Sequence, residues 1–556
     1  MKKVLLLVLS LALALTLSAC KTDDDGEEVV FNWNIGADPA TLDPGLNGAS
    51  DGGDVINNTF EGLVREINGE VLPGIAESWS TSSDGLTVTF NLRESNWSDG
   101  TPLTADDFVY SWLRAMDPTT ASEYSWIWHY TNVVGAEDFV NGDGTKEDVG
   151  ISAPDDYTFV VELLNPTDYF VSLMAFYHFM PVNQDAVEAG PDGTWAKDPE
   201  IYVSNGAFKL DSYSIGDGLV LVKNEEYWNV EEVGIDRIDA KFIDDESTAY
   251  TAFNAGDLDY IPSVPTAEVP ILIAESDEFY VFPLLGTYYY SFNMDADGDG
   301  VNEGFAEDGL WSNRKLRTAL NYAIDRDAIT EALGAGQVSA GGFVPPGFMD
   351  HEGNDFFETA GTYGLVTDDG NFDEAVSLFA DAASELGMSV SELQTALESE
   401  ELLYNTSEGH QFVAQMVQES WQQVLGFTMP LANQDWAIFQ DTRSQGDFSV
   451  ARGGWLTDFM DPSGLLGIFK SDNSYNDPNY YNSEFDTLLT EASTTTDTAT
   501  HFEKLYEAQE VFMTDFPIIP VYHYTDTMLV SDDLVGWGRS VLGTVDFTRA
   551  TINRSE

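Results

Sequence analysis

Alternating apolar and polar residues recur through the first half of the chain and predict short β-strands. Four runs carry this pattern, with Val, Ile, Phe and Thr prominent: 86–92 (LTVTFNL), 158–164 (TFVVELL), 218–224 (GLVLVKN) and 238–244 (IDAKFID). Such runs are typical of strands with one buried face. We therefore expect the first half to be rich in strands joined by long loops.

Helical periodicity becomes prominent in later segments. Apolar side chains recur at helical spacing through 314–333 (RKLRTALNYAIDRDAITEAL), and the same spacing appears in 374–386 and 410–425. The chain has 556 residues, which is more than one hydrophobic core usually serves. The pattern and the length together predict an α/β protein with more than one lobe, built from two or three domains.

The N-terminal residues carry a secretory pattern. Two lysines precede an apolar run over 4–17, and LSAC follows, ending on Cys20, the only cysteine in the chain. A basic start, a short apolar segment and small residues before a cleavage point describe a signal peptide over 1–19. LSAC resembles the bacterial lipobox, which implies a lipid on Cys20 and a lipid-anchored tether over 20–30. The alternative is a plain signal peptide with a chance cysteine.

The charge balance narrows the class of partner. The chain has 23 basic and 96 acidic residues, which gives a formal net charge of −73. Nucleic acid is excluded as a partner, because phosphate binding requires a basic face. An acidic surface of this kind suits high salt, where self-repulsion is screened. We expect a saline or alkaline habitat.

The stretch GGWLTDFMDP, residues 453–462, places two carboxylates among glycines and aromatic residues. Asp458 and Asp461 have Trp455, Phe459 and Met460 as neighbours. A carboxylate beside aromatic surface costs free energy unless a cation meets it, and the local sequence offers none. Either the stretch is an ordinary turn, or the missing cation belongs to a ligand.

An acidic segment over 295–303, DADGDGVNE, matches the start of a calcium loop. Asp295, Asp297 and Asp299 precede Gly300 at the expected spacing, but the glutamate of the twelfth position is absent. The segment is either a structural calcium loop or a bare acidic turn. We expect no other cofactor.

No motif supports an enzyme. The six histidines are scattered, and the chain lacks H-E-x-x-H, G-x-S-x-G, a P-loop and a G-x-G-x-x-G that opens a helix. The lone cysteine is assigned to the anchor. A secreted hydrolase would need a nucleophile or a metal site that the sequence does not display, so we expect a protein without catalytic activity.

Several stretches together resemble one family. Residues 76–118 (AESWSTSSDGLTVTFNLRESNWSDGTPLTADDFVYSWLRAMDP), 204–213, 222–229 and 316–329 are similar to extracellular solute-binding proteins of the peptide- and nickel-binding family, family 5. The likeness covers nearly all of the mature chain. It implies an α/β, two-lobed periplasmic-binding-protein-like fold of type II, with an additional domain and the ligand enclosed between the lobes.

The resemblance also divides the chain. It implies a discontinuous lobe I and, inserted in it, an additional domain over 63–202. The second lobe, 289–525, would carry most contacts to the ligand's ends. Lobe I itself would consist of three segments: 31–62, 203–288 and 526–556.

Three later segments, 402–427, 433–462 and 474–489, look like the oligopeptide-binding lipoproteins of ABC oligopeptide permeases. In those proteins an aspartate of the G-W-x-x-D-[YF] element binds the α-ammonium group of the peptide. The matching residue is Asp458, so the resemblance implies that the missing cation is the ligand's amino terminus. For Asp461 we expect a turn-capping role before the following proline.

The same resemblance assigns the other end of the ligand. His410, Arg443 and Arg452 match a histidine and two arginines that take the peptide's C-terminal carboxylate, in members that serve different peptide lengths. Trp455 and Trp436 match aromatic residues that line side-chain pockets. Ordinary core packing is the alternative for both tryptophans, and a core histidine is the alternative for His410.

Two glycines complete the expected site. Gly453 and Gly454 have no side chains, so the backbone of an extended peptide could approach them closely. Such a peptide could add to the edge of a strand, which pairs its backbone groups whatever its sequence.

The expected partners are oligopeptides, the membrane subunits of an ABC permease, and the membrane itself through Cys20. We expect a monomer held at the outer face of the cytoplasmic membrane. Two alternatives stay open on sequence alone. One is a peptide-pheromone sensor or adhesin without transport, and the other is a dipeptide, nickel or haem receptor of the same family.

Overall fold

The computed structural model describes residues 28–167, 169–191, 193–294, 309–366 and 371–554. Several predictions fall outside these residues: the signal peptide over 1–19, the lipidated Cys20 with most of the tether over 20–30, and the calcium loop with Asp295, Asp297 and Asp299. All of them stay predictions. Within the described part of the chain, no helix is long and apolar enough to span a bilayer.

One eleven-stranded mixed sheet runs through both lobes, in the order β10-β11-β12-β1-β13-β19-β14-β18-β16-β17 with β15 attached to β19. β1 pairs parallel with β12 and β13, and β16 pairs parallel with β18 and β17, while the other neighbours in this order pair antiparallel. The strands are β1 (Val30–Asn34), β10 (Phe208–Ser214), β11 (Gly218–Lys223), β12 (Arg237–Lys241), β13 (Tyr260–Ile261), β14 (Phe279–Phe292), β15 (Val338–Ser339), β16 (Leu402–Asn405), β17 (Leu431–Gln434), β18 (Val450–Leu456) and β19 (Ile518–Val530).

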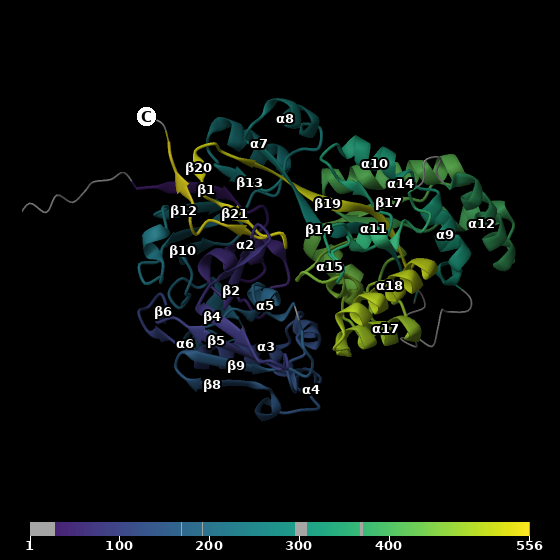
Figure 1. The fold of residues 1–556 in the computed structure, drawn as a ribbon. Helices are drawn as coiled ribbons and strands as arrows, with labels where there is room; N and C mark the ends of the chain where they lie inside the picture. Colours follow the sequence, from purple (N-terminus) through teal and green to yellow (C-terminus); the bar gives the residue numbers. More distant parts are fainter. Residues whose placement is uncertain (1–27, 168, 192, 295–308, 367–370, 555–556) are drawn as a thin grey trace, which may run out of the picture.

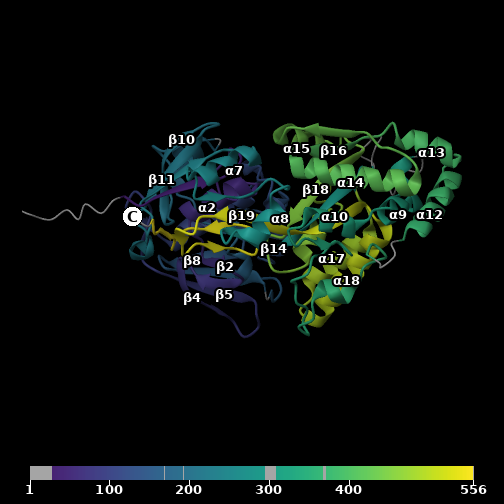
Figure 2. The ribbon, with the colours of Figure 1, turned by 90° about the horizontal axis from the view of Figure 1, so that it is seen from above.

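Two long strands, β14 and β19, join the two lobes of the molecule. Figures 1 and 2 show them passing from the lobe with β1, β10 and β12 into the lobe with β16, β18 and most of the later helices. They pair antiparallel along their length, and the register shifts between Pro283 and Thr287, near the middle of β14. The irregular ladder therefore lies where the chain leaves one lobe for the other.

A separate four-stranded antiparallel sheet lies beside the first lobe, in the order β4-β5-β9-β8. Helix α3 (Ala105–Met116) packs on it, and the ring of its Trp112 meets that of Phe159 edge-on at 4.9 Å. All of these residues fall within 63–202, the segment expected to form the additional domain. The strands are β4 (Ala76–Thr81), β5 (Thr87–Leu92), β8 (Ile151–Asp155) and β9 (Thr158–Glu162).

The helix predicted over 314–333 is wrong as a single element. It divides into α9 (Arg314–Tyr322) and α10 (Arg326–Leu333). The division has a local cause, because the Asp325 side chain accepts a hydrogen bond from the Ala328 amide and thereby caps a new helix. The helices predicted over 374–386 and 410–425 are confirmed as α12 (Phe372–Glu385) and α14 (Glu408–Leu425).

Further elements complete the lobes and the additional domain. The other α-helices of the described residues are α2 (Ser50–Thr59), α4 (Ala136–Val140), α5 (Phe170–Leu173), α6 (Gln184–Ala189), α7 (Glu246–Ala255), α8 (Val269–Glu275), α11 (Phe356–Ala360), α13 (Val390–Leu397), α15 (Trp436–Ser444), α16 (Ser463–Leu466), α17 (Ser483–Thr494) and α18 (Thr498–Asp515). Four two-stranded ribbons add β2 (Val64–Ile67) with β3 (Glu70–Pro73), β6 (Ser95–Asn96) with β7 (Pro102–Leu103), β20 (Leu534–Val535) with β23 (Thr551–Ile552), and β21 (Gly538–Arg539) with β22 (Val545–Asp546).

Candidate functional site

A cavity of about 580 Å³ lies between the two lobes. The additional domain contributes Tyr124 to its lining, and the C-terminal hairpin contributes Ser540. From the other lobe come Asp458 after β18, Arg452 on β18 and His410 on α14. Of the predicted ligand-binding residues, all but Gly453 line this one cavity, although they come from separate segments of the chain.

Asp458 is a buried carboxylate without a cation. Its side chain lines the cavity and is 5% exposed. The Tyr124 hydroxyl donates to Oδ1 at 3.4 Å, while Oδ2 has no hydrogen-bond partner among the described residues. Burial raises the pKa of Asp458 well above its ordinary value, and the Tyr124 hydrogen bond offsets only part of that shift. An isolated buried carboxylate is costly unless a positive group joins it.

Aromatic rings form the wall around this carboxylate. Trp455 lies 4.8 Å from the ring of Tyr475 and 5.9 Å from that of Trp126, and it stacks on Tyr124 at 6.5 Å. The Trp455 indole N–H donates to the Gly464 carbonyl at 3.1 Å, which fixes the ring. Sequence reasoning identified Trp455 but missed Tyr124 and Tyr475. No local signal marks them, since each gains its place only through tertiary packing.

Arg452 is a cation without a carboxylate. Its Nη2 donates to the Tyr524 hydroxyl at 2.7 Å, and its guanidinium carbon lies 5.0 Å from the centroid of Tyr288. No acidic side chain in the described ranges lies within ion-pair distance of it. Burial alone lowers the pKa of Arg452, but the neighbouring phenol groups outweigh that effect and raise it. The guanidinium therefore keeps its charge inside the cavity.

His410 lies in the first turn of α14, beside Arg452. Its ring is tilted against that of Tyr288 at 5.6 Å. Burial, followed by the positive charge of Arg452, lowers the pKa of His410 well below its ordinary value. The imidazole is thus neutral at pH 7 and can donate one N–H.

Arg443 lines the same cavity but has a partner within the protein. Its Nε lies 2.8 Å from Oδ2 of Asp477, and both side chains are largely buried. Burial raises the pKa of Asp477, and the charge of Arg443 opposes that shift. The sequence did not predict this ion pair. Of the two predicted arginines, Arg452 is therefore the one without a carboxylate partner in the described part of the chain.

The two glycines face different surroundings. A Cβ on Gly454 would lie 2.2 Å from the Tyr524 hydroxyl, at the cavity lining, so the absence of a side chain matters for the site. A Cβ on Gly453 would lie 2.2 Å from the ring of Tyr289, a fully packed residue. Gly453 does not line the cavity, and close ring packing explains it.

The structure distinguishes between the alternative roles given above for Trp436 and Asp461. Trp436 begins α15, lines the cavity and is 39% exposed, so core packing is wrong for this residue. Asp461 does have the turn-capping role: its Oδ1 accepts from the Ser463 amide at 3.0 Å at the start of α16. Its Oδ2 lies 2.8 Å from His501 Nε2.

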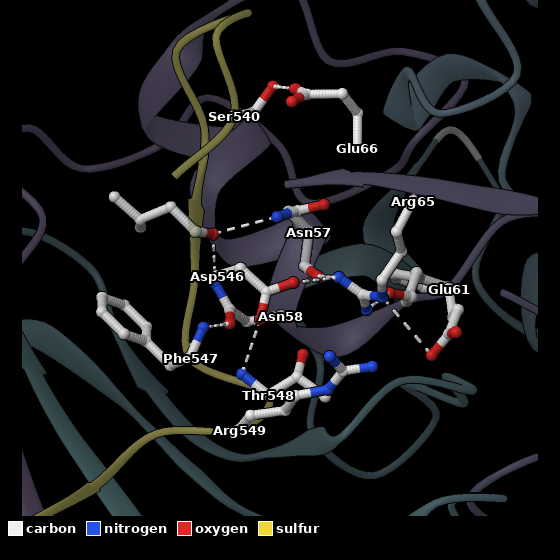
Figure 3. A network of polar contacts seen from close by, with 12 residues as sticks. Asn57, Asn58, Glu61, Arg65, Glu66, Ser540, Asp546, Phe547, Thr548 and Arg549 are labelled. Carbon is white, nitrogen blue, oxygen red and sulfur yellow. Dashed lines mark hydrogen bonds and ion pairs between the residues drawn. The ribbon is translucent and has the colours of Figure 1, made fainter. Parts of the chain in front are cut away.

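A polar network holds the C-terminal hairpin that closes one side of the cavity (Figure 3). The side-chain amides of Asn57 and Asn58 both donate to the Val545 carbonyl, at 2.9 and 3.0 Å. Arg65 Nη1 lies 2.7 Å from Asp546 Oδ2. The network also joins Glu66 to Ser540, and both of these residues line the cavity. The hairpin wall is therefore fixed to α2 and β2.

Among the residues that the structure describes, no three His, Cys, Asp or Glu side chains gather in a way that could hold a metal ion. Several charged side chains line the cavity, including Glu66, Glu246, Asp526 and Arg443. Two of its groups lie in aromatic walls: Asp458, with one carboxylate oxygen that lacks a hydrogen-bond partner, and Arg452, which has no carboxylate partner among the described residues. Such a site suits a ligand that carries both an ammonium and a carboxylate group.

Comparison with known proteins gives close relatives over the whole chain. The chain is 35% identical to the oligopeptide-binding protein OppA of Bacillus subtilis over 98% of each chain. The structure of Haemophilus influenzae OppA in complex with the peptide RPPGFSPFR is 31% identical, with a TM-score of 0.82, and covers 95% of this chain and 99% of that one.

The murein tripeptide-binding protein MppA of Escherichia coli, also 31% identical, gives a TM-score of 0.83 over 95% of this chain and 99% of that one. A structure titled as the unliganded open form of MppA gives 0.65, at 31% identity, over 95% of this chain and 98% of that one. The lobes are therefore arranged as in the peptide complex rather than as in that open form.

These likenesses confirm the predicted two-lobed, periplasmic-binding-protein-like α/β fold with an additional domain and a ligand site between the lobes. Residues 70–477 match the family model described as bacterial extracellular solute-binding proteins, family 5 Middle. Members of this family are solute-binding proteins rather than enzymes. The chain belongs to the family 5 bacterial extracellular solute-binding proteins.

Proposed function

We propose that this protein is an extracytoplasmic receptor that captures oligopeptides and delivers them to an ABC importer. The observation that carries the proposal is the buried carboxylate of Asp458, whose Oδ2 has no partner in the described chain. A peptide's α-ammonium group would provide the missing cation. A charge-assisted hydrogen bond of this kind is strong where water is excluded.

The opposite charge lies elsewhere in the same cavity. Arg452 has a phenol rather than a carboxylate as its partner, so it can pair with the C-terminal carboxylate of the ligand. The neutral imidazole of His410 can donate a further hydrogen bond to that group. Arg443 would contribute less, because Asp477 already meets its charge. A zwitterionic ligand fits both unpaired groups at once.

The strand between these two groups offers backbone pairing. β18 pairs with β14 along its whole length, but with β16 only at Val450 and Ala451. The other edge of residues 452–456 is therefore not used by the sheet. An extended peptide lying there would pair its N–H and C=O groups independently of its sequence, which is what a receptor for many peptides requires.

The relatives support the same ligand class. The Bacillus subtilis relative is named an oligopeptide-binding protein, and the Haemophilus influenzae structure contains a nine-residue peptide. We propose that peptide binding closes the two lobes about the β14–β19 connection and that the closed form is what the importer recognises. A lipid on Cys20 would hold the receptor at the membrane, and Cys20→Ser would release it into the medium.

Calorimetric titration of ligand-free protein tests the proposal, with three- to five-residue peptides and their N-acetylated twins. We expect Asp458→Asn to weaken binding by about 2–5 kcal/mol, the usual cost of removing one partner of a buried charge pair. Acetylation should remove binding to the wild type in the same way and add little to the loss in Asp458→Asn.

Asp472→Asn is the matched control, because this carboxylate is 67% exposed and far less confined than that of Asp458. It should bind like the wild type. Equal binding of free and acetylated peptides by the wild type would place the ammonium away from Asp458. Binding of neither would favour the metal, haem or adhesin alternatives.

A further inference from the structure

We propose that Tyr524 is a positioning residue for peptide recognition: its hydroxyl holds the guanidinium of Arg452 in the orientation that receives the ligand's C-terminal carboxylate. The proposal rests on the function proposed above and adds a residue and a mechanism to it. Tyr524 lies on β19 and Arg452 on β18, on either side of β14.

The side-chain partner of Arg452 differs from those of the other buried arginines in the described chain. Arg317 and Arg326 donate to backbone carbonyls. Arg65, Arg114 and Arg539 are each held by a carboxylate. Arg443, in the same cavity, is held by Asp477. Arg452 Nη2 instead donates to a phenol at 2.7 Å. A carboxylate would fix the side chain but would also neutralise it, whereas a hydroxyl fixes it and leaves its charge for an anionic ligand.

Aromatic rings restrict the guanidinium further. Tyr288 lies under it at 5.0 Å, and Tyr522 stacks on Tyr288 at 4.8 Å with the planes at 21°. Tyr288 and Tyr522 are also register partners on β14 and β19. The rings thus come from the two strands that join the lobes, which gives Arg452 a rigid support.

A glycine makes the contact between Arg452 and Tyr524 sterically available. A Cβ on Gly454 would lie 2.2 Å from the Tyr524 hydroxyl and 2.9 Å from Arg452 Nη2. Any side chain there would push the two groups apart. Gly454 therefore has a reason to be glycine that is separate from ligand approach.

The test is a titration of wild type and Tyr524→Phe with one tetrapeptide in two forms, the free C-terminal carboxylate and the C-terminal amide. Tyr524→Phe removes only the hydroxyl. We expect it to weaken binding of the free acid about tenfold and to leave binding of the amide unchanged within about twofold. Gly454→Ala, which displaces the same pair sterically, should also reduce the preference for the acid.

Tyr404→Phe, in a buried tyrosine of β16 that does not line the cavity, is the matched control and should preserve the preference. Equal losses for acid and amide in Tyr524→Phe would overturn the proposal, because they would indicate a general packing role. An unchanged preference in both Tyr524→Phe and Gly454→Ala would overturn it as well. If the wild type binds neither form, it is the proposed function itself that fails.

Discussion

The ring of Phe459 stacks on the ring of Tyr169, with centroids 5.1 Å apart and planes at 23°. Phe459 follows Asp458 directly and is fully buried, while Tyr169 and its neighbour Tyr130 belong to the additional domain on the opposite side of the cavity. The residue next to the proposed ammonium partner therefore forms an apolar contact between the two sides. Ligand binding at Asp458 and closure of the lobes would be coupled through two adjacent residues.

We expect Phe459→Ala to weaken peptide binding by about 1–3 kcal/mol, because the closed form loses a buried aromatic contact while Asp458 stays in place. Small-angle scattering at saturating peptide should show incomplete compaction. Met460→Ala, at a side chain that is 40% exposed, is the control. Wild-type affinity together with full compaction in Phe459→Ala would show that the contact does not contribute to closure.

Gly453→Ala should destabilise the fold rather than affect ligand contacts. The added methyl group would lie 2.2 Å from Cε2 of the Tyr289 ring, which is 2% exposed. Overpacking of this kind costs about 1–3 kcal/mol. Urea unfolding of the ligand-free protein measures the loss. If Gly453→Ala unfolds like the wild type but binds peptide less well, the prediction is wrong and Gly453 contributes to ligand binding.

Two buried histidines predict a loss of stability in acid. His178 and His523 are each 2% exposed, and burial lowers the pKa of each to about 3. In the unfolded chain a histidine takes up its proton near pH 6.5. The stabilisation of the folded state by these neutral, buried histidines is thus fully present above pH 6.5 and falls as the pH drops towards 3. The expected slope is about 1.4 kcal/mol per pH unit for each histidine.

The variant His178→Phe tests this dependence, since it removes the titrating group and keeps an aromatic ring beside those of Trp128 and Tyr124. Between pH 6.5 and pH 5 it should lose about 2 kcal/mol less unfolding free energy than the wild type. His351→Gln, at an exposed position, is the matched control. Parallel pH profiles for wild type and His178→Phe would refute the prediction.

Local patterns were sufficient for many elements and for the identity of several site residues. The alternation in 218–224 corresponds to β11, and the aromatic surroundings of Asp458 already indicated a missing cation. The division between α9 and α10 was not predicted, because the apolar stripe continues across it while the Asp325 cap decides the boundary. Hydrophobic periodicity indicates which face of a helix is buried, but it does not indicate which side chain caps a backbone N–H and so sets the helix boundary.

The partners of the site residues could not be predicted from the sequence. Tyr124 and Asp458 are 334 positions apart, and the strand order that brings them together is a property of the whole fold. The same holds for Arg443 and Asp477, where the resemblance assigned Arg443 to the ligand's C-terminal carboxylate. Gly453 and Gly454 look equivalent in sequence, yet strand alternation directs one towards Tyr289 and the other towards Tyr524.

The acidity of the chain predicts a stability that depends on salt. The net charge of −73 repels itself, and some of the charge lies at the cavity: burial and the nearby carboxylates of Glu408 and Asp245 raise the pKa of Glu246 to about 7. The Debye screening length shortens from about 10 Å at 0.1 M salt to about 3 Å at 1 M. We expect the thermal midpoint to rise by several degrees between 0.05 and 1 M NaCl. Peptide affinity should also change over this range, because added salt lowers the electrostatic repulsion across the cleft. Sucrose at matched osmolality separates screening from a general exclusion effect, and a midpoint that responds equally to sucrose and to NaCl would contradict the electrostatic explanation.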